Sequence, residues 1–318
     1  MPERLSIVGE TVSATTNHFL FESLIRHSES KEAFPVAVCW PCSALSLAGA
    51  MEAARAGIIY PILVGPEREL NGTAASLGFK LGSYEIIPAD SEETAAIRAV
   101  DLCRTGRATA LMKGSLHTDL LMHAALQKES GLRTTRRFSH VFVLEAPLYE
   151  RALFITDAAI NIYPTLDDKV DIAQNAIDLA HVLGVPVPRV AILSAVETVS
   201  SKIVSTIDAS ALCKMADRGQ ISGAILDGPL AFDTAVNAEA ARVKNLKSPV
   251  AGVADILLVP DLESGNMLAK QLEYLGGAKL AGIVLGAKVP IILTSRADSS
   301  ESRVASCAIA SALIDATA

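Results

Sequence analysis

The sequence has few aromatic and few charged residues. Aromatic residues make up 4% of its 318 residues and charged residues 20%, whereas 50% are hydrophobic. Disordered chains combine low hydrophobicity with high net charge, so this composition excludes disorder and allows a large buried core. Ala, Val, Ile and Leu dominate, which favours parallel strands covered by alanine-rich helices. The length suffices for two domains or for one large α/β unit.

A surplus of basic residues and a long apolar run are also absent. The net charge is −7 and no basic stripe occurs, which argues against nucleic acid as a partner. In VAGVADILLVP the apolar run is interrupted at Asp255, and no segment approaches the ~20 apolar residues of a membrane span. The stretch MPERLSIVGETVSATTNHF has no basic region followed by an apolar one, so we predict no signal peptide and no membrane partner.

Cysteine occurs five times, an odd number without a disulfide framework. This usage predicts a reducing, cytoplasmic location. Cys39 and Cys42 in CWPC have the spacing of a redox pair, but no further Cys or His stands near them at zinc spacing, so we predict no metal. A redox module stays an alternative to the interpretation of Cys39 as a buried residue of a strand. GxGxxG and GxSxG are absent, so neither the usual nicotinamide site nor a serine hydrolase elbow is supported.

Short apolar segments alternate with amphipathic ones along the chain. Strands are expected at residues 35–40, 61–65, 84–88, 108–114, 140–145, 152–157, 189–196, 223–229, 254–260 and 279–286. Helices are expected in between, among them 91–104, 118–127, 167–183 and 208–218, and HFLFESLI (18–25) predicts a further helix. The alternation predicts a mostly parallel sheet, with an antiparallel pair or hairpin at 140–157. In such sheets ligands bind at the carboxyl ends of strands, near helix N-termini.

The first candidate site is PIILTSRADSSES, residues 290–302. An apolar run stops at Thr294, and Ser295 and Arg296 precede a helical pattern. A hydroxyl and a guanidinium at a helix start suit a phosphate group. Asp298 and Glu301 have the spacing of a capping pair. The alternative is a surface arginine beside a capping serine.

The second candidate is LMKGSLHTDLL, in which Lys113 ends a strand and Ser115 precedes a helix. This arrangement also suits phosphate, although the glycine spacing is not that of a Walker loop. The alternative is a solvated lysine with a capping serine. His117 is a candidate acid–base group or a structural histidine.

Three further polar segments follow expected strands. They contain Asp157 and Asn161 in TDAAIN, Asp227 and Gly228 in LDGPLAFDTAV as a tight polar turn after a strand, and Asn266 opening a helix. Each segment suits a binding role, and each also suits a purely structural turn.

Taken in order, these segments resemble a known family. TDAAINIYPT, ILDGPLAFDTAV, VPDLESGNMLAKQLEYLGGA and PIILTSRADSSES are similar to successive signature blocks of the phosphate acetyltransferase and phosphate butyryltransferase family. MKGSLHTDLL and RRFSHVFVLE are more similar to the butyryltransferase side. The resemblance covers about residues 35 to 318.

The resemblance implies an enzyme that interconverts acyl-CoA and phosphate with acyl phosphate and CoA, for a short acetyl or butyryl chain. It implies CoA as a substrate and no permanently bound cofactor. The implied fold is that of isocitrate and isopropylmalate dehydrogenases: two α/β domains with an interdomain cleft, usually in a homodimer. On this basis we expect one domain of residues 1–154 plus 290–318 and a second of residues 155–289.

The resemblance also assigns residues. The family's Ser-Arg pair falls on Ser295 and Arg296, whose arginine is implied to hold the phosphate. Ser302 stands where many acetyltransferases carry the Asp proposed as base, and HTDLLMHAAL lacks an arginine of those enzymes, so Lys113 is expected to supply that charge. These departures favour the butyryl branch and leave the base unassigned. Substrate-binding roles are expected for Ser115, His117, Asp157, Asn161, Asp227, Gly228 and Asn266.

Two alternatives of other classes stay open at this point. One is an NAD-dependent oxidoreductase of the same fold, since fold relatives can bind NAD without the glycine fingerprint. The other is a noncatalytic protein that binds CoA or acyl phosphate, which the absence of the family Asp would permit.

Overall fold

The structure is a computed structural model that describes residues 20–317. The chain forms two compact units. One is the continuous unit, Arg137–Leu280, and the other is the split unit, which combines Phe21–Arg136 with the segment from Ala281 on. The expectations about a signal peptide and about the first two residues of HFLFESLI lie outside the described residues, and the rest of that segment falls in a helix.

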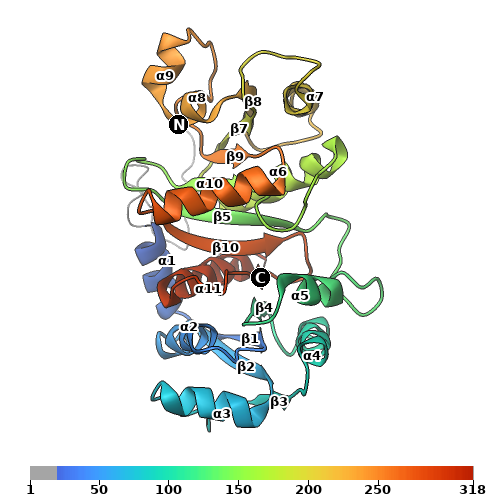
Figure 1. Cartoon of the computed structure of the whole chain (residues 1–318), viewed down its shortest axis with the longest axis vertical. Helices are drawn as coiled ribbons and strands as arrows, with labels where there is room; N and C mark the ends of the chain where they lie inside the picture. The colour runs from blue at the N-terminus through green and yellow to red at the C-terminus, as the bar shows by residue number, and fades with distance from the viewer. Residues whose placement is uncertain (1–19, 318) are drawn as a thin grey trace. The chain divides into compact units, whose positions relative to one another are not determined.

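The split unit is built from alternating strands and helices (Figure 1). Its helices are α1 (Leu20–Glu29), α2 (Ala44–Arg55), α3 (Glu67–Ser76), α4 (Glu92–Arg104), α5 (Thr118–Ala125) and α11 (Ser300–Asp315). Its strands are β1 (Phe34–Cys39), β2 (Ile59–Gly65), β3 (Ile86–Pro88), β4 (Ala110–Lys113), β10 (Lys279–Leu285) and β11 (Ile291–Ile292).

The strand order in the split unit is β3-β2-β1-β4-β11-β10. All neighbours are parallel except β10 and β11, which are antiparallel. The late strand β11 therefore lies beside the early strand β4. Helix α11 packs against α2, and α4 packs against α5, as Figure 1 shows.

The continuous unit has a second series of elements. Its helices are α6 (Leu166–Val182), α7 (Val204–Asp217), α8 (Phe232–Val236), α9 (Ala238–Val243) and α10 (Leu262–Tyr274). Its strands are β5 (Ser139–Glu145), β6 (Leu153–Thr156), β7 (Arg189–Leu193), β8 (Ile225–Leu230) and β9 (Ile256–Leu258). The order is β5-β6-β9-β7-β8, antiparallel between β5 and β6 and parallel elsewhere.

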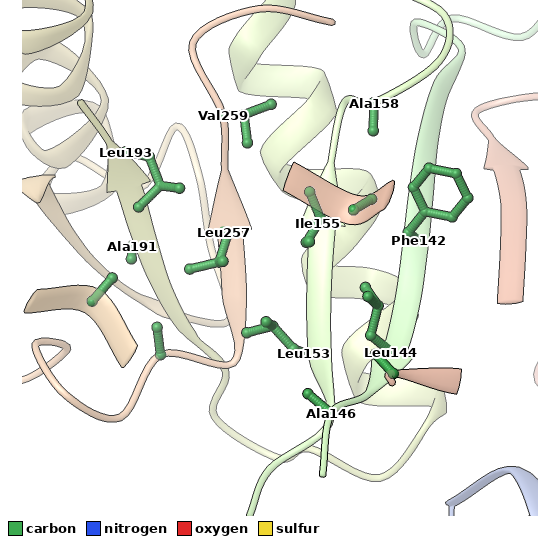
Figure 2. Packing of buried hydrophobic residues seen from close by; sticks show 14 of the residues in the cluster. Phe142, Leu144, Ala146, Leu153, Ile155, Ala158, Ala191, Leu193, Leu257 and Val259 are labelled. Carbon is green, nitrogen blue, oxygen red and sulfur yellow. The ribbon is translucent and has the colours of Figure 1, made fainter. Parts of the chain in front are cut away.

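An apolar cluster fills the core of the continuous unit. Figure 2 shows side chains from β5, β6, β7 and β9 in it, among them Phe142, Ile155 and Leu257. The labelled side chains are small or aliphatic, apart from the one aromatic ring. This agrees with a sequence that is rich in aliphatic residues and poor in aromatic ones.

Several sequence expectations are confirmed. The fold is mixed α/β with mostly parallel strands, and the segments 140–145 and 152–157 form the antiparallel pair β5–β6. The expected helix over 91–104 is α4, whose N-cap Ser91 accepts a hydrogen bond from the Thr94 N–H. Gly57 and Gly184 follow the ends of α2 and α6 with positive φ angles of 73° and 85°.

One helix begins earlier than expected. We predicted a helix over 208–218, whereas α7 runs Val204–Asp217. Its first turn contains β-branched residues and serine, whose low helix propensity hides the start. The Thr206 hydroxyl donates to the carbonyl of Ile203 at 2.7 Å and so supports this turn.

The two compact units divide the chain differently from the expected domains. The expectation places borders after residues 154 and 289, whereas the compact units change over at Arg137 and at Ala281. The difference arises because β6 pairs with β9, so that β5 and β6 belong with the strands that follow them. The domain borders at 154 and 289 stay a prediction about independent folding.

Candidate active site

Three neighbouring parallel strands of the split unit end at one edge of its sheet. They are β1, β4 and β11, which end at Cys39, Lys113 and Ile292 and lead toward helices α2, α5 and α11. Because parallel strands share their carboxyl edge, the segments after Lys113 and after Ile292 emerge side by side. The first two candidate segments of the sequence therefore lie together.

Lys113 is a buried cation at this edge. Its side chain is 3% exposed, and its Nζ donates to the Gly114 carbonyl at a long 3.4 Å. The pKa of Lys113 is lowered to about 8, mainly by burial and then by the positive charges of Arg296 and Arg303, against the opposing effects of Asp298 and Cys39. Two arginines thus stand close enough to Lys113 to repel its charge. An anion bound by Lys113 and Arg296 would relieve that repulsion.

The turn after Lys113 is fixed to the turn after β1. The Gly114 N–H donates to Cys39 O at 2.8 Å, and the Ser115 hydroxyl donates to Trp40 O at 2.8 Å. A Cβ on Gly114 would lie 2.4 Å from Cys39 O, so only glycine permits this approach. His117 is exposed at the N-cap position of α5, where its side chain makes no capping hydrogen bond.

Ser295 and Arg296 belong to a closed turn rather than to the helix start. The Ser295 N–H donates to the Asp298 carboxylate at 2.6 Å, and the Ala297 N–H donates to Ser295 Oγ at 3.3 Å. Arg296 is exposed within this turn. The predicted capping pair of Asp298 and Glu301 is wrong, because Asp298 bonds back to Ser295.

Helix α11 is capped one residue later than predicted. Its N-cap is Ser299, whose hydroxyl accepts from the Ser302 N–H at 3.1 Å. Ser302 is therefore occupied in the first turn of the helix. The helix begins at Ser300, so Arg296 precedes the free N–H groups by a full turn of chain.

One residue of this edge was missed by the sequence reasoning. Arg303 is 1% exposed, and its guanidinium donates to the carbonyls of Ser295, at 2.8 Å, and of Asp298. An arginine in the first turn of an Ala- and Ser-rich helix has no local feature that distinguishes it from a solvated one. Its burial depends on the neighbouring helix α2.

In the continuous unit, Asp157 and Asn161 bond to one another and to the backbone. The Asp157 carboxylate accepts from the N–H groups of Ala159, Ile160 and Asn161 at 2.9–3.1 Å and from the Asn161 amide. Burial raises the pKa of Asp157, while these donors favour its charged form. Asn161 also accepts from Arg137 Nε at 2.6 Å. The two side chains hold the loop after β6 in place.

Asn266 lies inside α10 and does not open it. The helix begins at Leu262 after the N-cap Asp261, whose carboxylate accepts from the Ser264 N–H at 2.8 Å. Asn266 donates to Ala158 O at 3.2 Å, which ties α10 to the loop after β6. This corrects the expected helix start, because the aspartate supplies the cap.

Asp227 and Gly228 lie within a strand and not in a turn after it. They belong to β8, where the Asp227 carboxylate accepts from the Gly228 N–H at 2.9 Å. The register against β7 shifts between Ala191 and Leu193, so the strand continues past an irregularity that the sequence shows as a turn. A Cβ on Gly228 would lie 2.7 Å from Ile192 O, which explains the glycine.

The CWPC thiols have no activated character. Burial is the main cause that raises the pKa of Cys39, and it raises the pKa of Cys42 to about 12. A redox pair needs a lowered thiol pKa, so the geometry disfavours the redox alternative.

Between residues 20 and 317, no group of three or more His, Cys, Asp or Glu side chains is placed to hold a metal ion. None of the helices in that range has the length and hydropathy needed to cross a membrane.

The protein therefore has a mixed α/β fold, and the carboxyl edge of the sheet in its split unit carries a cluster of cations suited to an anion such as phosphate. Residues 89–311 match the family profile described as "Phosphate acetyl/butaryl transferase". The chain belongs to this family of acyl-transferring enzymes.

Individual relatives agree with the family. The chain is 57% identical over 290 residues to a phosphate acetyltransferase of Rhizobium meliloti, covering 91% of this chain and 92% of the relative. It is 42% identical to a phosphate butyryltransferase of Clostridium acetobutylicum over 91% of this chain and 96% of the relative. Its fold matches the crystal structure of a branched-chain phosphotransacylase from Enterococcus faecalis V583 with a TM-score of 0.76 and 31% identity, over 88% of this chain and 99% of that one.

Proposed function

We propose that this chain transfers a short acyl group between CoA and inorganic phosphate, interconverting acyl-CoA and phosphate with acyl phosphate and CoA. Membership of the phosphate acetyl/butyryl transferase family supports the reaction class. One observation supports the location of the active site: the positive charge of Arg296 lowers the pKa of Lys113, at the neighbouring carboxyl ends of β11 and β4. CoA acts as a substrate in this proposal, and no permanently bound cofactor takes part.

The reaction is a displacement at the acyl carbonyl. A phosphate oxygen attacks the thioester carbon, a tetrahedral oxyanion forms, and the C–S bond breaks to release CoA thiolate. Arg296 and Lys113 neutralise the phosphate so that it can approach, and the Ser295 hydroxyl donates a hydrogen bond to it. Holding both substrates together supplies much of the acceleration.

The reverse reaction requires a CoA thiolate. A thiol has an ordinary pKa near 8.5, and neighbouring cations lower it. The cation cluster therefore takes over part of the role of a strong base, which fits the serine at position 302.

Further residues are proposed to bind substrate. Ser115 and His117 follow Lys113 at the same edge, and His117 has an exposed side chain there. In the continuous unit the proposed residues are Asp157, Asn161, Asp227, Gly228 and Asn266. Asp157 and Asn161 would act through the loop that they hold, since their polar atoms bond to that loop and to the start of β5.

The finer assignments are proposals that rest on the family resemblance. They are a homodimer in the cytoplasm, and a two-domain fold related to isocitrate and isopropylmalate dehydrogenases. Equilibrium sedimentation of the purified chain tests the dimer.

The activity is tested by release of free CoA thiol from acetyl-, propionyl- and butyryl-CoA, with and without phosphate. We expect release that depends on phosphate, and the rank of kcat/KM gives the preferred chain length. No release with any substrate, together with thermal stabilisation by CoA, would indicate a binding protein without activity. Stabilisation by NAD but not by CoA would indicate the oxidoreductase.

A further inference from the structure

Arg303 is a fully buried charge without a carboxylate hydrogen-bond partner in the described chain. It lies in the first turn of α11 and is 1% exposed. Its guanidinium bonds go to the backbone carbonyls of Ser295, Asp298 and Ser299, and its Nε has no hydrogen-bond partner among the described residues. Burying a cation in this way is costly, so it calls for a role other than general stability.

The carbonyls that Arg303 binds are the two ends of the turn that carries Arg296. One terminal nitrogen donates to Ser295 O at 2.8 Å and the other donates to Asp298 O. Between these points the turn is closed by the Ser295 N–H on the Asp298 carboxylate, at 2.6 Å. The planar guanidinium thus bridges the two ends of a four-residue turn. The ammonium group of a lysine is a point charge and cannot make both hydrogen bonds with the same geometry.

A glycine on another helix provides the space for this side chain. Gly49 lies in the interior of α2, where glycine is unfavourable. A Cβ built on Gly49 would lie 2.3 Å from Arg303 Cδ and 2.9 Å from Arg303 Cβ. The stem of Arg303 therefore lies directly on the backbone of α2, and its direction toward the turn is fixed by packing.

The Arg303 charge also reaches the proposed phosphate position. Its positive charge is one of the influences on Lys113, together with Arg296, Asp298 and Cys39. Arg303 has two separable properties, a fork that holds the turn and a charge that acts on Lys113.

We propose that Arg303 is a positioning residue, which locks the Ser295–Asp298 turn from behind and thereby places the Ser295 hydroxyl and the Arg296 guanidinium for phosphate, with Gly49 as the space it requires. This inference rests on the proposed acyl transfer to phosphate. It adds two residues to those proposed for the active site: Arg303, which touches no substrate, and Gly49, which lies in a distant part of the sequence.

The test compares Arg303→Lys, which keeps the charge and loses the fork, with Arg303→Met, which loses both. Thiol release is measured against phosphate and against acyl-CoA as a function of pH. We expect both variants to raise KM for phosphate by about tenfold or more and to leave KM for acyl-CoA within about twofold, because only the phosphate ligands are displaced. Only Arg303→Met should move the alkaline limit of phosphate use to higher pH, since Lys113 then loses a positive neighbour.

Two further variants separate positioning from folding. Gly49→Ala pushes the stem of Arg303 while leaving its guanidinium intact, and we expect the same selective rise in KM for phosphate. Ile309→Val removes a buried methyl group from α11 away from the turn, and it should lower thermal stability while leaving both KM values unchanged.

The outcomes are distinguishable. Absence of phosphate-dependent release in the unmutated chain would overturn the proposed function itself. If that chain is active and Arg303→Lys keeps its KM for phosphate, then the arginine acts as a charge and the positioning role is wrong. Loss of cooperative melting in all variants at positions 303 and 49 would likewise assign Arg303 to the fold alone.

Discussion

Arg296 and Ser302 lie in the same segment after β11 and have opposite expected importance. Arg296 is exposed in the turn at the carboxyl edge and influences Lys113, whereas the Ser302 N–H is bound by the cap Ser299. The guanidinium can meet two phosphate oxygens at once, while the serine has a local structural role.

We therefore expect Arg296→Ala to lower kcat/KM for phosphate by about a hundredfold or more, the cost of losing an aimed charge in an active site. Ser302→Ala should change it by less than about threefold, because the cap is formed by Ser299. Both are measured by phosphate-dependent thiol release. Equal losses in the two variants would contradict the assignment.

Lys113 shows a conflict between function and stability. Its pKa is lowered to about 8, mainly by burial, so the folded protein holds an unfavourable ammonium at neutral pH. Between about pH 8 and the unfolded value near 10.5, the unfolded chain binds more protons than the folded one. The contribution of Lys113 to stability therefore rises with pH across this window.

Replacing Lys113 by Met should stabilise the protein at pH 7 by up to about 3 kcal/mol, the free energy of a shift of this size, and abolish activity. The gain should shrink as the pH rises from about 8 and approach zero only above about pH 10.5, where the lysine is neutral in both the folded and the unfolded chain. Urea unfolding in phosphate-free buffer at both pH values measures it. A Met variant that is less stable at pH 7 would show that Lys113 is well paired.

At the level of the elements, Gly114 allows the turn after β4 to pack closely against the turn after β1. A side chain there would collide with Cys39 O at 2.4 Å and with Trp40 O at 2.5 Å, both backbone atoms that cannot move independently. The approach of the turn after β4 to the turn after β1 depends on this glycine.

Gly114→Ala should lower stability by roughly 2 kcal/mol or more and reduce activity, because the turn that follows Lys113 must shift. Gly72→Ala is the matched control. Gly72 lies in α3 with nothing within 4 Å of an added Cβ, so alanine there should stabilise by about 0.5–1 kcal/mol. Thermal unfolding of both variants checks the pair, and similar shifts in Tm would refute it.

At the scale of the molecule, the two units differ in continuity. The strands β5, β6, β9, β7 and β8 all lie within residues 137–280. Residues 21–136 lack β11, the neighbour of β4, and α11, which packs on α2. The split unit therefore cannot be completed by its first segment.

We expect a fragment of residues 137–280 to unfold cooperatively and a fragment of residues 21–136 to remain unfolded, as followed by circular dichroism on heating. The sequence-based domain border gives instead the fragment 155–289, which lacks β5 and half of β6. Cooperative unfolding of that fragment with the same Tm as 137–280 would support the border at 154. Failure of 137–280 to fold would contradict the division by contacts.

Local patterns in the sequence are enough to predict the fold class and several of the site residues. Alternation of apolar segments and helical patterns predicted the α/β class, and the ordered blocks identified the family. Lys113, Ser295 and Arg296 were predicted as candidates because each follows a strand. These signals lie within a few residues of one another, so no tertiary contact is needed to read them.

Which polar side chains are buried depends on contacts between segments that lie far apart in the chain. The fold directs the Asp298 carboxylate back to Ser295 and buries Arg303 against Gly49. Arg303 and Gly49 lie far apart in the sequence, and neither shows its partner by any local period. Burial is decided by which segments pack together, and that packing of α11 on α2 exists only in the folded chain.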